Sequence, residues 1–149
     1  MSTTEALAPV KKTIQVEASI EAAFDTFTRR IGDWWPASTH TIFGDMMDAV
    51  VFDEHVGGRV YERAEDGEEA DWADVMVWEP PRRLVLRWRV NPERGPTEVE
   101  VRFTPENGGT RIDLEHRGWD RIADETGRAD YDPGWDFVLG HYLDWLQSE

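Results

Sequence analysis

Two residues of this chain, His116 and Asp74, have side chains suited to general acid–base chemistry, and both lie in segments that alternate as strands do. His116 follows Ile112 and Leu114 at spacings of two, so the alternation predicts that its ring shares their covered face. A histidine with a pKa near about 6.5 can act there as a general base or donate to a ligand. The commoner arrangement is a ring satisfied by a backbone carbonyl. An inward Asp74 close to His116 would make this pair the place for proton transfer.

Tryptophan is the most informative residue type, with eight in 149 residues. Burying such rings yields about 1.5–3 kcal/mol each, so they can simply fill a core. Alternatively, flat rings line a ligand pocket, with His116 or Tyr142 orienting the ligand. On that alternative, the candidate ligand-binding residues are Trp35, Phe43, Trp72, Met76, Trp78, Trp88, His116, Trp135 and Tyr142.

Motifs for metals, phosphates and nucleophiles are absent from the sequence. His141 and Asp144 stand at i and i+3, but one such pair is too few for a metal site, and no HExxH cluster exists. Glycine pairs at 57–58 and 108–109 lie in hairpins rather than between a strand and a helix, and GxSxG is missing. The sequence therefore predicts no metal and no cofactor, and leaves it uncertain whether the protein is an enzyme.

The composition is strongly acidic, with 31 acidic and 16 basic residues and a formal charge of −15. Such a charge repels phosphate backbones and anionic lipids, so nucleic acid and membrane are poor partners. No stretch approaches the roughly 20 apolar residues of a membrane span, and the first residues lack a signal-peptide core. The chain contains no cysteine, which fits a reducing cytoplasm.

The elements that would position these residues begin with a strand over 12–17 and an amphipathic helix over about 20–31, capped by Ser19. An irregular stretch with a short second helix follows, as far as Asp48. Six short strands separated by Gly, Pro and Asn-Gly turns then occupy 49–116 and indicate an antiparallel meander.

One face of this meander is apolar and the other carries charges of both signs. The inward residues are Leu84, Leu86, Trp88, Val90, Val99, Val101, Phe103, Ile112, Leu114 and His116. The segment WADVMVW (72–78) does not sort clearly. We expect Trp72, Asp74, Met76 and Trp78 to point inward, because that covers the larger surfaces.

The last segment, 131–147, predicts a helix with Asp132 as N-cap and Pro133 at the first helical position. Its apolar residues cover more than half of the helix circumference, whereas a helix on a flat sheet needs a stripe of roughly 100°. The sheet is therefore expected to curl around the helix. The apolar positions are Trp135, Val138, Leu139, Tyr142, Leu143 and Leu146, flanked by Phe137, His141 and Trp145.

Several of these segments together resemble the SRPBCC (START-like) superfamily, in the branch related to activators of heat-shock-protein ATPase. The matching pieces, in order, are SIEAAFDTFT (19–28), WWP (34–36), VGGRVYE (56–62), WEPPRRLVLRW (78–88), TEVEVRFTP (97–105), GGTRIDLEHRGW (108–119) and YDPGWDFVLGHYLDWL (131–146). The resemblance covers about residues 10–147. It implies an α+β helix-grip fold, in which a curved seven-stranded antiparallel sheet surrounds a long C-terminal helix and two short helices follow the first strand. One such domain would span 11–149, after a flexible lead-in at 1–10.

Three functions follow from this resemblance. Family members commonly enclose a cavity for lipids, sterols, polyketides or other apolar molecules, which makes a small-molecule binding protein the first hypothesis. A co-chaperone-like or other protein-interaction domain, with a chaperone as partner, is the second. A polyketide cyclase- or dehydratase-like enzyme using His116 and Asp74 is the third. The matched motifs are scaffold residues and bring no catalytic assignment.

Overall fold

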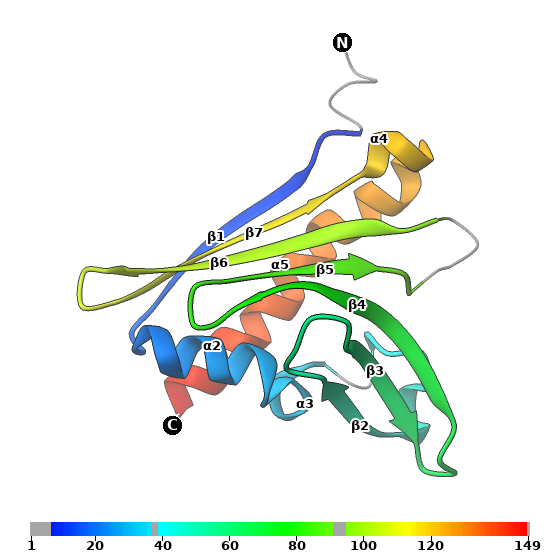
Figure 1. The fold of residues 1–149 in the computed structure, drawn as a ribbon, viewed down its shortest axis with the longest axis horizontal. Coiled ribbons are helices and arrows are strands. Elements are labelled where there is room, and N and C mark those ends of the chain that lie inside the picture. Colours follow the sequence, from blue (N-terminus) through cyan, green and yellow to red (C-terminus); the bar gives the residue numbers. More distant parts are fainter. Residues whose placement is uncertain (1–6, 37–38, 91–94, 149) are drawn as a thin grey trace.

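The computed structural model describes residues 7–36, 39–90 and 95–148, in which seven strands form a single antiparallel sheet (Figure 1). The strand order is β1-β7-β6-β5-β4-β3-β2, so every pair except β1–β7 joins neighbours in sequence. The six-stranded meander expected over 49–116 is confirmed. The strands are β1 (Val10–Val16), β2 (Met47–Phe52), β3 (Arg59–Ala64), β4 (Glu69–Glu79), β5 (Arg83–Trp88), β6 (Thr97–Glu106) and β7 (Gly109–Arg117).

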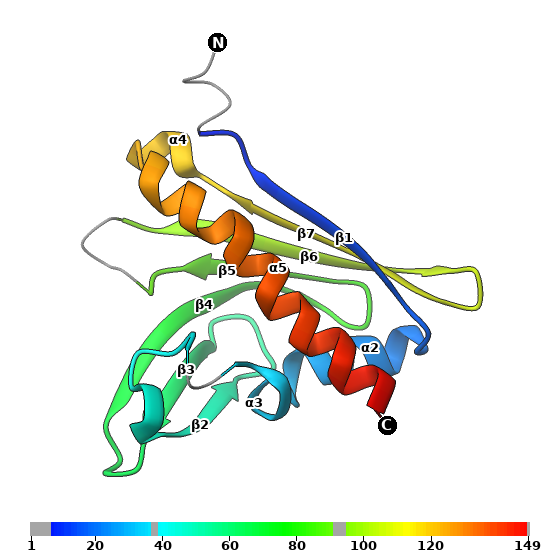
Figure 2. The same ribbon diagram turned by 180° about the vertical axis from the view of Figure 1, so that it is seen from behind.

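The sheet curls, and the long helix α5 (Glu125–Ser148) runs diagonally across its covered face (Figure 2). Two short helices, α2 (Ile20–Thr28) and α3 (Ile31–Trp34), follow β1 and pack near the C-terminal end of α5. A 3-10 turn, Gly44–Met46, precedes β2, and helix α4 (Trp119–Ile122) precedes α5. This is the helix-grip architecture expected from the sequence. No helix within 7–36, 39–90 or 95–148 has the length and apolar character that crossing a bilayer requires.

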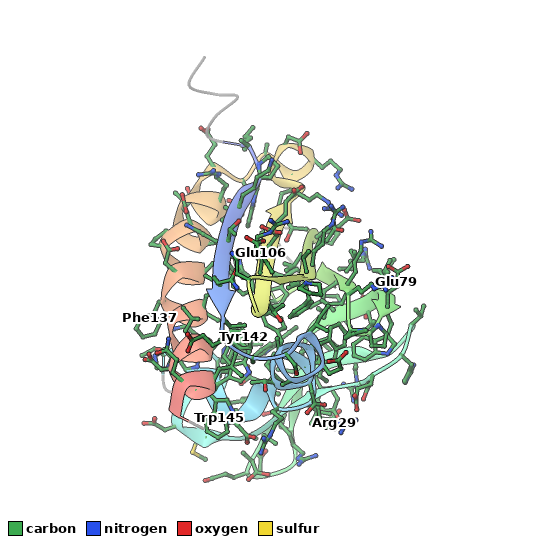
Figure 3. The ribbon with its side chains drawn as sticks, turned by 90° about the vertical axis from the view of Figure 1, so that its left-hand side faces the viewer. Arg29, Glu79, Glu106, Phe137, Tyr142 and Trp145 are labelled. Atoms are coloured by element: carbon green, nitrogen blue, oxygen red, sulfur yellow. The ribbon has the colours of Figure 1, made fainter. Side chains whose placement is uncertain are left out.

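The covered face of α5 supplies much of the core. Trp135, Val138, Leu139 and Tyr142 are each at most 3% exposed, as their spacing predicts. In contrast, Phe137 is 47% exposed and lies on the side of α5 away from the sheet, whereas Tyr142 points between helix and strands (Figure 3). The apolar arc of the helix is therefore wider than the sheet can cover.

The start of α5 differs from the sequence prediction. The helix begins at Glu125 rather than at Pro133, which lies inside it. Asp124 is the residue that caps it, because its side chain accepts a hydrogen bond from the backbone N–H of Gly127 at 3.0 Å. Proline favours the first turn of a helix, but the additional helical turns before Pro133 outweigh that preference.

Strand β4 corrects the expectation that Asp74 and Met76 point inward. Its register shifts once against β3 beside Trp72 and once against β5 beside Met76, so it contains two bulges. Each bulge adds a residue to one strand and reverses which side chains face the core. Met76 is consequently 49% exposed, and Asp74 lies on the outer face beside Arg87 and Arg89.

The outer face of the sheet is a network of ion pairs. Glu100, on β6, accepts hydrogen bonds from Arg83, Arg102 and Arg117 at 2.6–2.7 Å and is nearly buried beneath them. Burial alone would raise the pKa of Glu100, but the three guanidinium groups outweigh it and lower the pKa to about 2. The charged outer face predicted from the alternation is thus confirmed, and its charges form ion pairs.

Of the N-terminal lead-in expected over 1–10, residues 1–6 lie outside the described part of the chain. Val10 already pairs with His116 in the sheet, and the carbonyl of Ala8 accepts a hydrogen bond from the Arg128 side chain on α5. The folded unit therefore includes residues just before the predicted boundary at 11.

Candidate ligand pocket

A pocket of about 320 Å³ lies between residues 130–138 of α5, Trp35, residues 40–42 and the adjoining parts of β4 and β5. Its size falls at the lower end of the range usual for small-molecule sites, about 300–1,000 Å³. The five aromatic lining residues are Trp35, Trp72, Trp88, Tyr131 and Trp135; the others are His40, Thr41, Ile42, Val90, Asp130, Gly134 and Val138.

Four of the tryptophans contact one another in a closed ring. The centroids are 4.8 Å apart for Trp35 and Trp72, 6.1 Å for Trp72 and Trp88, 5.8 Å for Trp88 and Trp135, and 6.1 Å for Trp135 and Trp35. The interplanar angles range from tilted to perpendicular, as aromatic pairs prefer. We call these four residues the tryptophan ring.

Each indole N–H of the tryptophan ring is bound to a protein acceptor. Trp35 donates to the carbonyl of His40 at 2.8 Å and Trp88 to the hydroxyl of Tyr131 at 2.8 Å. The remaining two donate to buried side chains, Trp72 to Glu62 at 2.6 Å and Trp135 to His116 at 3.0 Å. These bonds fix the orientation of the rings, and the parts of the four residues that border the pocket are aromatic carbon.

His116 is fully buried beneath the tryptophan ring, and both of its ring nitrogens are occupied. Nδ1 accepts from Trp135, so Nε2 carries the proton and donates to Thr97 Oγ1 at 2.7 Å. Burial lowers the pKa of His116 to about 3. The inward position is confirmed, but the ring is neutral and its partners are side chains rather than the expected carbonyl.

Asp74 does not accompany His116, because the bulges of β4 turn it to the opposite face of the sheet. There its carboxylate accepts two hydrogen bonds from Arg89 at 3.0 Å. The paired acid–base site considered from the sequence is therefore not formed.

Glu62 is the important residue that sequence reasoning missed. It is fully buried on β3, and its two carboxyl oxygens accept from the backbone N–H groups of Ile42 and Phe43, each at 2.7 Å, as well as from Trp72. Glu62 thus joins the segment 42–43 to the tryptophan ring. The signal was present in the sequence, because Val60, Glu62 and Ala64 alternate on one face.

The rim of the pocket is held by a contact between His40 and α5. The ring of His40 stacks on Phe137, with centroids 4.9 Å apart, and Phe137 also contacts His141 at 4.8 Å. Burial lowers the pKa of His40, and the nearby His141 lowers it further. The neutral imidazole is therefore favoured at this rim.

Among the predicted ligand-binding residues, the structure brings Trp35, Trp72, Trp88 and Trp135 together at the pocket. Trp78 lies elsewhere, against Phe24 and Phe52, and the Tyr142 hydroxyl donates to the carbonyl of Ala23 at 2.7 Å. Burial raises the pKa of Tyr142. His116 supports the wall from behind, and Met76 is on the surface. Phe43 is not among the lining residues; its backbone N–H binds Glu62.

Tyr131 and the segment 40–42 complete the pocket without having been predicted. Tyr131 was assigned to the residues just before the last helix, and its position on α5 became clear only with the earlier helix start. Within the described parts of the chain, no group of three or more His, Asp or Glu side chains is arranged to hold a metal ion.

The family profile described as "Activator of Hsp90 ATPase homolog 1-like protein" matches residues 17–145, which is most of the chain. The chain belongs to this family. Its fold is accordingly that of the SRPBCC superfamily, as the residues in order along the sequence suggested. No match was found among curated proteins.

Solved structures with the same fold include proteins of several kinds. Protein MLL2253 from Mesorhizobium loti is 19% identical, with a TM-score of 0.72 over 94% of this chain and 97% of that one. An AHSA1-like protein from Aeromonas hydrophila is 24% identical, with a TM-score of 0.64 over 93% and 92%. Txn09, an anthrahydroquino-γ-pyrone synthase, is 29% identical, with a TM-score of 0.62 over 92% and 96%.

Proposed function

We propose that this protein binds a small molecule with a flat, apolar body in the pocket between the curved sheet and α5. The observation that carries the proposal is the tryptophan ring, whose four N–H groups are all bound within the protein beside a space of about 320 Å³. Rings held by their own hydrogen bonds keep their positions without a ligand, so the site is formed in advance. We also propose that the protein is cytoplasmic, which cell fractionation would test.

The relatives support a small-molecule role. Txn09 is named as a synthase of an anthrahydroquino-γ-pyrone and was solved in complex with a ligand. The pocket of the present chain has the aromatic lining that suits a flat molecule of comparable character.

Binding accounts for the pocket better than catalysis does. His116 is neutral with both nitrogens occupied, and Asp74 lies on the outer face, so neither acid–base candidate reaches a ligand. The titratable side chains that do line the pocket at its rim are His40 and Asp130, with the hydroxyl of Tyr131 already bound to Trp88. A co-chaperone role finds less support, since the outer face of the sheet is covered by ion pairs.

Gly134 provides the experiment. It lies on α5 at the pocket wall, and a Cβ built on it meets no atom within 4 Å. Gly140 lies on the same helix, also has open space at its Cβ, and does not line the pocket. Gly134→Leu should therefore fill the pocket without disturbing the fold, and Gly140→Leu is the matched control.

The probe is N-phenyl-1-naphthylamine, a neutral aromatic dye whose fluorescence rises in an apolar site. We expect saturable binding to the wild type, unchanged binding to Gly140→Leu, and at least about a tenfold loss of affinity in Gly134→Leu, from overlap with the new side chain. No saturable binding to the wild type, or equal binding to both variants, would contradict the proposal.

A further inference from the structure

The charges on the pocket wall are of one sign. Among the described residues that line it there is no lysine and no arginine, and Asp130 supplies a carboxyl group at the rim. The other ionisable group at the rim, the imidazole of His40, has a lowered pKa and favours its neutral form. The chain as a whole carries a formal charge of −15. The charge of the lining and the net charge of the chain thus both favour a cation over an anion at the pocket.

The aromatic wall acts in the same direction. An indole has a negative face and its most positive atom is the N–H hydrogen, which in all four residues of the tryptophan ring is directed at a protein acceptor. The wall consequently offers a ligand aromatic carbon and no indole donor. An anionic group would find neither a basic side chain nor an indole N–H there, whereas a cation is attracted to the ring faces.

The tryptophan ring is one continuous aromatic wall rather than a cage. Its four indoles contact one another at centroid separations of 4.8–6.1 Å, with Tyr131 beside Trp88 and Trp135, so a ligand can meet them only from the pocket side. Aromatic surfaces attract alkylated ammonium groups, because such groups are weakly hydrated and lose little on leaving water. Gly134 leaves additional room beside Trp135 on α5.

We propose that the ligand of this pocket is an organic cation, an apolar or aromatic body bearing a quaternary or alkylated ammonium group, held by the tryptophan ring with Asp130 at the rim. This inference rests on the proposed binding function and specifies its ligand class.

Three probes of the same shape test it. Benzyltrimethylammonium carries a positive charge, neopentylbenzene replaces its nitrogen by carbon and is neutral, and phenylmethanesulfonate is a similar anion. Each is measured by displacement of N-phenyl-1-naphthylamine and by quenching of tryptophan fluorescence. We expect the cation to bind about tenfold more tightly than its neutral isostere, and the anion not to compete.

Asp130→Asn examines the carboxyl group, and Asp144→Asn is the control, since it removes the same charge from an exposed position of α5 outside the pocket lining. Asp130→Asn should weaken binding of the cation by about threefold to tenfold, and Asp144→Asn should leave it unchanged. An unchanged cation affinity in Asp130→Asn would remove Asp130 from the site.

The failures of the two proposals are distinguishable. Equal affinities for the cation and its neutral isostere, with binding of N-phenyl-1-naphthylamine still lost in Gly134→Leu, would overturn the cation inference and leave the binding function standing. Absence of binding by all four compounds would overturn both.

Discussion

Two clusters of aromatic rings lie under opposite halves of α5, and they differ in how their rings are held. Under the C-terminal half, Phe24, Phe27 and Phe103 pack edge to face, with centroids 5.1 Å and 5.9 Å apart, and Tyr142 packs on Phe27 at 5.4 Å. Under the N-terminal half, the tryptophan ring borders the pocket. We call Phe24, Phe27 and Phe103 the phenylalanine cluster.

Phenylalanine has no polar atom, so its ring is positioned by the atoms that surround it. An empty space beside such rings removes contacts and lowers the free energy of unfolding, by about 24 cal/mol per Å³ of cavity in one measured series. Tryptophan carries an N–H that can be bound at one edge of the ring while the opposite side remains uncovered. The rings beside the pocket are therefore held by hydrogen bonds, and the rings of the closely packed half by contact with one another.

The largest effect should come from Phe27→Ala in the phenylalanine cluster. Phe27 is 3% exposed, and its removal leaves a cavity between Trp34, Phe103 and Tyr142. We expect the free energy of unfolding to fall by about 3–5 kcal/mol, measured by urea denaturation.

Trp35→Ala is the matched change in the tryptophan ring, and it should cost less than Phe27→Ala although tryptophan is larger. Trp35 is half-buried and borders the pocket, so part of its surface makes no protein contact to lose. An equal or greater loss in Trp35→Ala would show that the two halves are stabilised in the same way.

Glu62→Gln should have an intermediate effect, concentrated at the pocket. An amide cannot accept all three N–H groups that the carboxyl group of Glu62 accepts, and its NH₂ would face a donor from Ile42, Phe43 or Trp72. A loss of about 1–3 kcal/mol is expected, with faster hydrogen exchange at the amides of Ile42 and Phe43.

The control is Glu65→Gln, in an exposed position just after β3, which should change stability by less than about 0.5 kcal/mol. If amide exchange at 42–43 is as slow in Glu62→Gln as in the wild type, Glu62 does not hold this segment.

The smallest effect is a dependence of stability on pH through His116. Its pKa is about 3 in the folded protein and near about 6.5 in the unfolded chain, so the unfolded chain binds more protons between these values. Stability should therefore fall as the pH drops below 6.5, by about 1 kcal/mol between pH 7 and pH 5.5, measured by urea denaturation at each pH.

His116→Gln removes this titration and should flatten the profile over that interval. His40 also has a lowered pKa and contributes in the same direction, so the wild type and His116→Gln are compared with His40 present in both. Identical slopes would refute the assignment.

The sequence predicted those parts of the fold that repeat regularly. The alternation of Val99, Val101 and Phe103 and the apolar face of α5 depend on burial along an unbroken element, and both are confirmed. Strand β4 could not be sorted in this way because two bulges interrupt its period, which misplaced Asp74 and Met76. The start of α5 was wrong because Pro133 is a stronger local signal than Asp124.

The sequence predicted most of the aromatic residues that line the candidate pocket, but not Glu62, the residue that holds one of them, Trp72, from behind. The four tryptophans of the ring were all among the predicted pocket residues, together with Trp78, which lies against Phe24 and Phe52 instead. Glu62 was missed because a charged residue in a strand is ordinarily assigned to the solvent face, and its three N–H partners come from two other segments, residues 42–43 and β4. Only the folded arrangement brings those donors to one carboxyl group.

Strand β1 forms one edge of the sheet, and both lysines of the chain, Lys11 and Lys12, stand in it. Lys12 reaches across to Asp132 and Asp136 on α5, so the helix is tied along this border. Charged lysines on an outermost strand oppose the addition of a strand from another molecule, which is a common first step toward aggregation. The same placement confines side-chain amine acylation to this one border, so a dye attached there would lie on a strand that the ligand pocket does not use.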